Sequence, residues 1–163
     1  MSESNNFDLI DKLRREWEYE DPMLDTSAMD VVGRVIKLAS QWTVETNAAM
    51  KPFGLKYTEF DIIATLRRSG KPYELTPTQL CESILLTSGA MTTALNRVEQ
   101  LGLIERALSV SDKRVKTARL TQVGISLARK AAERRFGLAK HHVQNLSKKE
   151  INTLTSLLKI CGP

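Results

Sequence analysis

The fold is decided by the stretch TPTQLCESILLTSGAMTTALNRVEQLG, residues 76–102. Thr76 is a favourable N-cap, Pro77 is tolerated at the first helical position, and a glutamine three residues after the cap completes a capping box. We therefore predict a short helix over 77–83 and a second one from about 87 to 101, which ends at a glycine. Two short helices joined by a few residues are typical of a helix-turn-helix.

The second helix of this stretch has two different faces when its residues are placed about 100° apart. Met91, Leu95 and Val98 form one apolar stripe, which predicts burial. The opposite face has no carboxylate, and its side chains are small or form hydrogen bonds, as contact with base edges and phosphates requires. The DNA contacts expected from this helix are Ser88, Gly89, Thr92, Thr93, Asn96 and Arg97.

A β-hairpin is predicted directly after the helix-turn-helix. Residues 104–108 and 116–120 are strand-like, and the connection between them is basic. A basic hairpin tip can enter a minor groove, and Asp112 can hold an arginine there by a charge-assisted pair. The DNA contacts expected from this wing are Lys113, Arg114 and Lys116.

The rest of the chain reads as helices. They are expected over 7–19, 29–50, 58–68 and 121–144, with a last helix that begins at the capping box of residues 147–150. Two of them carry apolar stripes, formed by Val31, Val32, Val35, Ile36, Ala39 and Trp42 in one and by Ile151, Leu154, Leu157, Leu158 and Cys161 in the other. The fold class is therefore mainly α with a small β-hairpin wing.

Composition fits one ordinary globular domain of 163 residues. Residues 1–30 hold nine acids and three bases, whereas the remaining 133 residues hold 21 bases and ten acids. An acidic arm on a basic body favours a polyanionic partner such as nucleic acid. The chain has no apolar run of about 20 residues that could span a membrane. Since its first residues do not resemble a secretory signal either, we expect a cytoplasmic protein.

From Thr58 to Gly124 the chain resembles the MarR family of winged helix-turn-helix transcriptional regulators. The resemblance depends on the helix-turn-helix, the motif Asp112-Lys113-Arg114 and the exit segment RLTQVG at 119–124. The segment EFDIIATLRR at 59–68 and an early helix carrying Trp17 are similar to the PecS-type, urate-responsive branch. The resemblance implies a homodimer that represses genes by binding a pseudo-palindromic DNA operator. Residues 1–52 and 121–163 would supply the dimerisation helices, and 53–120 the DNA-binding lobe.

The resemblance also implies a ligand pocket. In the PecS-type branch a tryptophan, an aspartate and two arginines surround urate, and three of these positions correspond to Trp17, Asp61 and Arg106. The other arginine is replaced by Ala94. We expect Asp61 and Arg106 to form an ion pair covered by Trp17. Because the pocket has lost one cation, a smaller anionic aromatic acid should fit it better than urate.

The sequence leaves two other functions open. Cys81 or Cys161 could act as the sensor of a thiol redox switch, although two free thiols in a reducing compartment are the simpler interpretation. A helical interaction module that does not bind DNA is the second alternative. No catalytic grouping stands out, no cofactor is implied, and the adjacent His141 and His142 lie on different helix faces, which disfavours a metal site.

Overall fold

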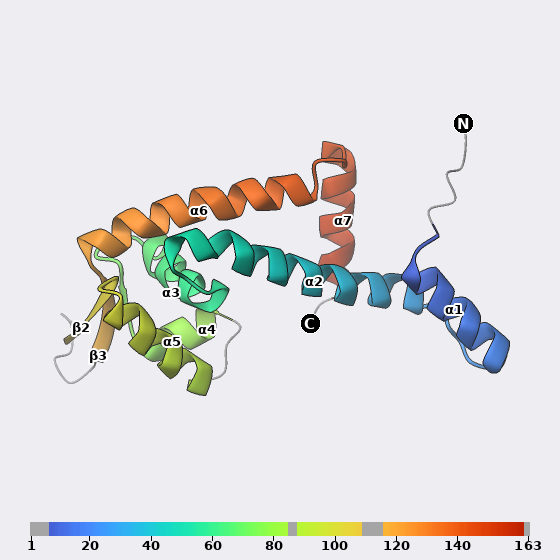
Figure 1. Cartoon of the computed structure of the whole chain (residues 1–163), viewed down its shortest axis with the longest axis horizontal. Helices are drawn as coiled ribbons and strands as arrows, with labels where there is room; N and C mark the ends of the chain where they lie inside the picture. The colour runs from blue at the N-terminus through green and yellow to red at the C-terminus, as the bar shows by residue number, and fades with distance from the viewer. Residues whose placement is uncertain (1–6, 85–87, 109–115, 162–163) are drawn as a thin grey trace. The chain divides into compact units, whose positions relative to one another are not determined.

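The structure is a computed structural model that describes residues 7–84, 88–108 and 116–161. The chain forms two units, residues 1–45 and 46–163, and helix α2 crosses the boundary between them. The elements are α1 (Leu9–Glu20), α2 (Met29–Met50), the 3-10 turn η1 (Lys51–Phe53), α3 (Tyr57–Arg68), β1 (Glu74–Leu75), α4 (Pro77–Ser83), α5 (Ser88–Gln100), β2 (Ile104–Leu108), β3 (Lys116–Leu120), α6 (Gln122–His142) and α7 (Lys148–Cys161). Figure 1 labels the α-helices together with β2 and β3.

In the N-terminal unit, one arginine of α2 binds three carboxylates. The guanidinium of Arg34 lies 3.1 Å from Asp8, 2.8 Å from Asp11 and 3.1 Å from Asp30. Asp8 also caps α1 by accepting the backbone N–H groups of Ile10 and Asp11. The Asp8 backbone N–H and the Arg34 guanidinium both hold the pKa of Asp11 below its usual value. This ion-pair network joins α1 to α2.

The centre of the second unit is α3. Three of its side chains, Ile62, Ile63 and Leu66, are completely buried. The helix packs against α4, α5, α6 and β3, so one apolar core holds the helix-turn-helix, the sheet and the long helix α6 together. The orientation of α3 therefore determines where its polar side chains point.

Helix α3 begins differently from the prediction that Thr58 caps it. The N-cap is Lys56, whose backbone N–H donates to the Glu59 carboxylate at 2.8 Å. The Asn47 side chain of α2 accepts the next backbone N–H, that of Tyr57, at 3.1 Å. The helix starts one residue before Thr58 because these two side chains satisfy its first N–H groups.

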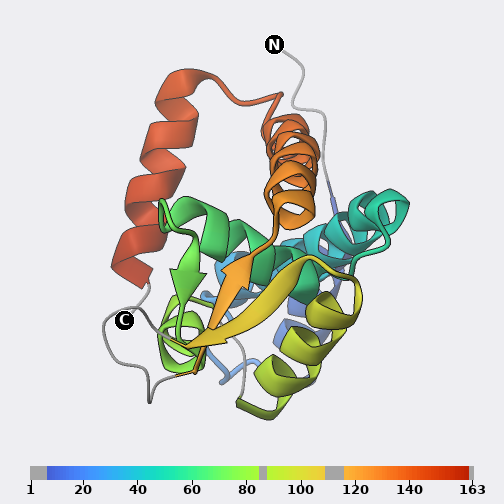
Figure 2. The same cartoon turned by 90° about the vertical axis from the view of Figure 1, so that its left-hand side faces the viewer.

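The helix-turn-helix agrees closely with the sequence analysis. Thr76 and Gln79 form the predicted capping box at the start of α4, with bonds of 3.2 and 2.9 Å. Helix α5 ends before Gly102, which has a φ of +68° that suits glycine. The two predicted strands are also confirmed, as β2 and β3 pair antiparallel. The sheet nevertheless has a third strand, because β1 pairs with the other edge of β3 (Figure 2).

The last two helices begin at predicted caps. Thr121 accepts the backbone N–H of Gly124 at 3.0 Å in the first turn of α6. Ser147 and Glu150 form the capping box before α7. Helix α6 ends at His142, two residues earlier than predicted. Among the described residues, no helix is both long and apolar enough to cross a membrane.

The close approach of α6 to the segment before β2 requires a glycine. A Cβ atom at Gly124 would overlap the backbone carbonyl of Leu103, whereas one at Gly137 on the same helix would meet no atom within 4 Å. Gly124→Ala should therefore lower the free energy of unfolding by about 1–3 kcal/mol or more. The matched control Gly137→Ala should raise it by up to about 1 kcal/mol. Urea unfolding at one fixed protein concentration compares the two, and equal effects would contradict this packing.

Candidate nucleic-acid interface

Helix α5 presents its polar face to solvent. Met91, Leu95 and Val98 are almost completely buried, as the apolar stripe predicts. The opposite side chains are exposed, and they are those of Thr92, Thr93, Asn96, Arg97 and Gln100, beside the exposed Gly89. The structure thus confirms which face of α5 is available to a partner. That this face contacts DNA stays a prediction.

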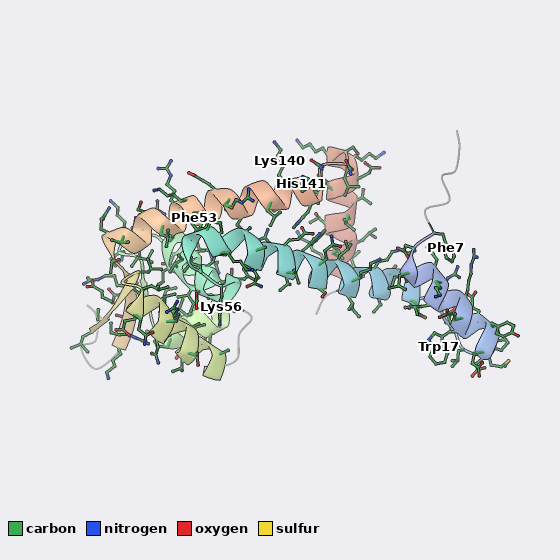
Figure 3. The ribbon with its side chains drawn as sticks, in the orientation of Figure 1. Phe7, Trp17, Phe53, Lys56, Lys140 and His141 are labelled. Atoms are coloured by element: carbon green, nitrogen blue, oxygen red, sulfur yellow. The ribbon has the colours of Figure 1, made fainter. Side chains whose placement is uncertain are left out.

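Arg97 on this face forms a long ion pair with α3. Its Nε lies 4.0 Å from Oε1 of Glu59, and the Glu59 side chain is only 6% exposed. The same carboxylate accepts the backbone N–H of Lys56 at the N-cap of α3 (Lys56 is labelled in Figure 3). A carboxylate that is fixed by its own helix cap can restrict a long, half-exposed arginine without covering it.

Asn96, the neighbour of Arg97, is held from the sheet. Arg106 of β2 donates from Nη2 to Oδ1 of Asn96 at 3.1 Å. The Nε of the same guanidinium lies 3.3 Å from Oε2 of Glu99, also on α5. Two adjacent residues of the exposed face are therefore in contact with two different neighbouring elements.

A groove of about 410 Å³ lies along one side of this face, between the start of α3 and the first half of α5. It is lined by Lys56, Thr58, Glu59, Gly89, Ala90, Thr93, Ala94 and Arg97. Of the predicted wing contacts, the structure describes Lys116, which is exposed at the start of β3. The side chain of Ser88 and the residues Asp112, Lys113 and Arg114 lie outside the described part of the chain.

The predicted ion pair between Asp61 and Arg106 is wrong. Arg106 binds Asn96 and Glu99, because its position in β2 directs the side chain toward α5. The charged groups that act on Asp61 are instead Arg135 and Arg68. Trp17, the third predicted ligand residue, belongs to the N-terminal unit, where its side chain extends from α1 and is 49% exposed (Figure 3).

Asp61 lines a cavity of about 620 Å³ within the second unit. The walls come from α3, α6 and the end of α4, namely Tyr57, Thr58, Phe60, Asp61, Ala64, Thr65, Arg68, Ser83, Ile84, Arg135, Phe136 and Ala139. Burial raises the pKa of Asp61, and the positive charges of Arg135 and Arg68 oppose that rise. Arg135 also lies over the ring of Tyr57, with 5.9 Å between Cζ and the ring centroid.

Sequence reasoning missed both arginines of this cavity. Arg68 lies seven residues after Asp61, two turns further along the same side of α3, and this spacing could have indicated it. No comparable signal exists for Arg135, because only the packing of α6 against α3 brings it near Asp61.

These features define a winged helix-turn-helix protein. Comparison with known proteins gives the family. The sequence profile described as MarR family matches residues 53–115. The transcriptional regulator MhqR of Bacillus subtilis is 31% identical over 117 residues, which cover 71% of this chain and 78% of the relative. The regulator PecS of Dickeya dadantii is 28% identical over 149 residues, 91% of this chain and 90% of the relative.

Solved structures agree with these relatives. A cysteine-to-serine mutant of E. coli MarR in complex with operator DNA superposes with a TM-score of 0.71 at 25% identity, covering 86% of this chain and all of that one. AbsC of Streptomyces coelicolor, at 21% identity over 85% of this chain and 94% of that one, has the same fold with a TM-score of 0.74. The chain belongs to the MarR family and is a transcriptional regulator of that family.

The raised pKa of Asp61 gives a pH dependence with a definite sign. The folded protein holds this proton more tightly than the unfolded chain, so stability falls as the pH rises from the unfolded value of 3.8 through the raised folded value. Asp61→Asn removes the free-energy cost of burying an ionised carboxylate in the folded protein. Urea unfolding should show the variant as more stable than the wild type at pH 7, and the difference should vanish near pH 3.5. A variant that is less stable at pH 7 would contradict the assignment.

Proposed function

We propose that the chain is a homodimeric DNA-binding repressor that a small anionic aromatic ligand releases from its operator. The main observation in favour of DNA binding is the exposed face of α5. It has no carboxylates, and it lies on the side of the helix opposite the buried apolar stripe. The operator complex of the similar E. coli MarR mutant supports it. A basic body of 133 residues would attract the phosphate backbone, and the protein would act in the cytoplasm, where its operator lies.

The wing and helix α5 would make two different kinds of contact with DNA. Lys116, with Lys113 and Arg114 of the wing, would bind phosphates or a minor groove and so set affinity and register. Residues of α5 would read base edges in the major groove, with Thr92, Thr93, Asn96 and Arg97 as the side chains in question. Gly89 and Ser88 at the start of α5 would allow close approach of the backbone to the duplex.

Exposed apolar side chains support the homodimer. On α2, Val31, Val32, Val35 and Ile36 are between 43% and 65% exposed. On α7, Leu154, Leu157, Leu158 and Ile160 are between 42% and 80% exposed. Apolar stripes of this kind indicate a surface that a partner covers. We assign the dimer to residues 1–52 and 121–163 and a pseudo-palindromic operator to its two-fold symmetry.

The cavity beside Asp61 supports the ligand response. A carboxylate placed there would meet Arg68 and Arg135, and an aromatic ring would lie against Phe60 and Phe136. Arg68 also donates to the backbone carbonyl of Ser83, the last residue of α4, at 3.0 Å. A ligand that drew Arg68 away would weaken the link between α3 and the helix-turn-helix, to the extent that it prefers that state.

The redox alternative has less support. Cys81 is partly buried and packs against the core, whereas Cys161 is exposed at the end of α7, and both are free thiols. Membership of a family of transcriptional regulators favours a regulator over a helical interaction module.

DNA binding should depend steeply on salt. The logarithm of the association constant should fall against the logarithm of salt concentration with a slope of about −0.9 for each phosphate contact. Fluorescence anisotropy with an operator fragment and with unrelated DNA measures the slope and the specificity, and sedimentation gives the mass of the free protein. A slope near zero, or a monomer at micromolar concentration, would refute the proposed function.

Ligand binding should depend on the arginines of the cavity. Benzoate-like and phenolic acids titrated calorimetrically into Arg135→Gln should bind about tenfold or more weakly than to the wild type, because a charge-assisted contact is lost. The matched control is Arg134→Gln, which removes the neighbouring exposed arginine outside the cavity. Equal losses in both variants would assign the effect to general charge rather than to this cavity. Urate should bind the wild type poorly, because Ala94, which lines the groove beside α5, stands where the urate-responsive branch has an arginine.

A further inference from the structure

Three side chains from two elements meet beside the exposed face of α5. Asn96 and Glu99 come from the helix, and Arg106 comes from β2. The guanidinium of Arg106 reaches both, at 3.1 Å to Asn96 Oδ1 and 3.3 Å to Glu99 Oε2. The Arg106 side chain is 31% exposed and that of Glu99 is 41% exposed, so the cluster lies at the edge of the proposed interface rather than beneath it.

The chemistry of arginine determines the orientation of the asparagine amide. A guanidinium has five N–H donors and no acceptor, so the amide atom that faces it must be the oxygen. The Nδ2 group of Asn96 then points away from Arg106. Glu99 holds the same guanidinium by a charge-assisted bond, which keeps Arg106 beside the amide before any DNA arrives.

We propose that Arg106 is a positioning residue for DNA reading, which fixes the Asn96 amide with its donor group toward the duplex. This inference rests on the proposed function, in which Asn96 contacts bases. A donor held in this way matches the acceptors of the major groove, namely purine N7, guanine O6 and thymine O4. It opposes the amino groups of cytosine and adenine. An unrestrained asparagine can instead turn its oxygen to those amino groups. Loss of Arg106 therefore weakens the discrimination between bases at the position that Asn96 contacts.

The same hairpin offers a matched control. Arg119 on β3 forms an ion pair of 2.8 Å with Glu105 on β2, and its side chain is 41% exposed. Arg119 is paired in register with Glu105, whereas Arg106 is paired with Ala118, so the two arginines lie on opposite faces of the sheet. Arg119 thus resembles Arg106 in exposure and in having a glutamate partner, but it does not contact Asn96. Arg119→Met is therefore the control for Arg106→Met.

The experiment compares Arg106→Met, Arg119→Met, Asn96→Ala and the double variant Asn96→Ala/Arg106→Met. Sites selected from random duplex DNA by the wild type define the operator, and dissociation constants for all single-base variants of it give the preference at each position. Arg106→Met should reduce discrimination about fivefold or more at the position that Asn96→Ala identifies. Arg119→Met should leave that position unchanged. In the Asn96→Ala background, Arg106→Met should have no further effect.

Other outcomes overturn the inference in ways that can be told apart. An equal loss of affinity on every sequence, or an effect that persists in the Asn96→Ala background, means that Arg106 contacts DNA itself. An Asn96→Ala variant with the wild-type preference removes Asn96 from the interface and overturns the inference alone. A wild type without any sequence preference overturns the proposed function as well. Thermal unfolding midpoints and affinity for unrelated DNA, both unchanged in Arg106→Met, exclude misfolding as the cause.

Discussion

The complete burial of one face of α3 is the constraint on which the second unit depends. Ile62, Ile63 and Leu66 have no exposed surface, so α3 cannot rotate without opening the core that it shares with α4, α5, α6 and β3. Its polar residues are consequently presented in fixed directions. Glu59 faces Arg97 of the helix that we assign to DNA, and Asp61 faces the cavity that we assign to the ligand. One helix therefore contributes to both sites, and a change at either site acts on the same packed element.

The exposed face of α5 is ordered by its neighbours as well as by its own helix. Arg97 forms a long ion pair with Glu59 of α3, and Asn96 accepts a hydrogen bond from Arg106 of β2. Immobilising a flexible side chain on binding costs about 0.5–1.5 kcal/mol, so contacts that restrict it beforehand reduce that cost. They also limit which hydrogen-bonding groups the face can offer. Because the restraints come from two different elements, a shift of α3 or of the wing would alter recognition without any change in α5 itself.

The parts of the fold and site that sequence predicted are those that local rules determine. The capping boxes at Thr76 and Ser147, both long strands and the two faces of α5 follow from residues within a few positions of one another. The sequence did not predict the short strand β1, because only pairing with β3 makes its two residues a strand. The predicted start of α3 was too late in the sequence, because the first turn of the helix bonds to the distant Asn47. Whether Arg106 reaches Asp61 or Asn96 likewise depends on the register of β2 and on the packing of the sheet against α5, and neither is encoded locally.

The charges of the two units also have different consequences. In the N-terminal unit, Asp8, Asp11 and Asp30 share Arg34, so these three carboxylates are paired within the unit. Isolated surface ion pairs contribute about 0–1 kcal/mol, but a guanidinium shared by three carboxylates forms a network in which each partner restrains the others. In the second unit, by contrast, Arg97 remains half exposed although it is paired, and basic residues are in excess. Pairing within the acidic unit leaves its net charge negative, so electrostatic attraction toward a polyanion has to come from the second unit, where basic residues are in excess.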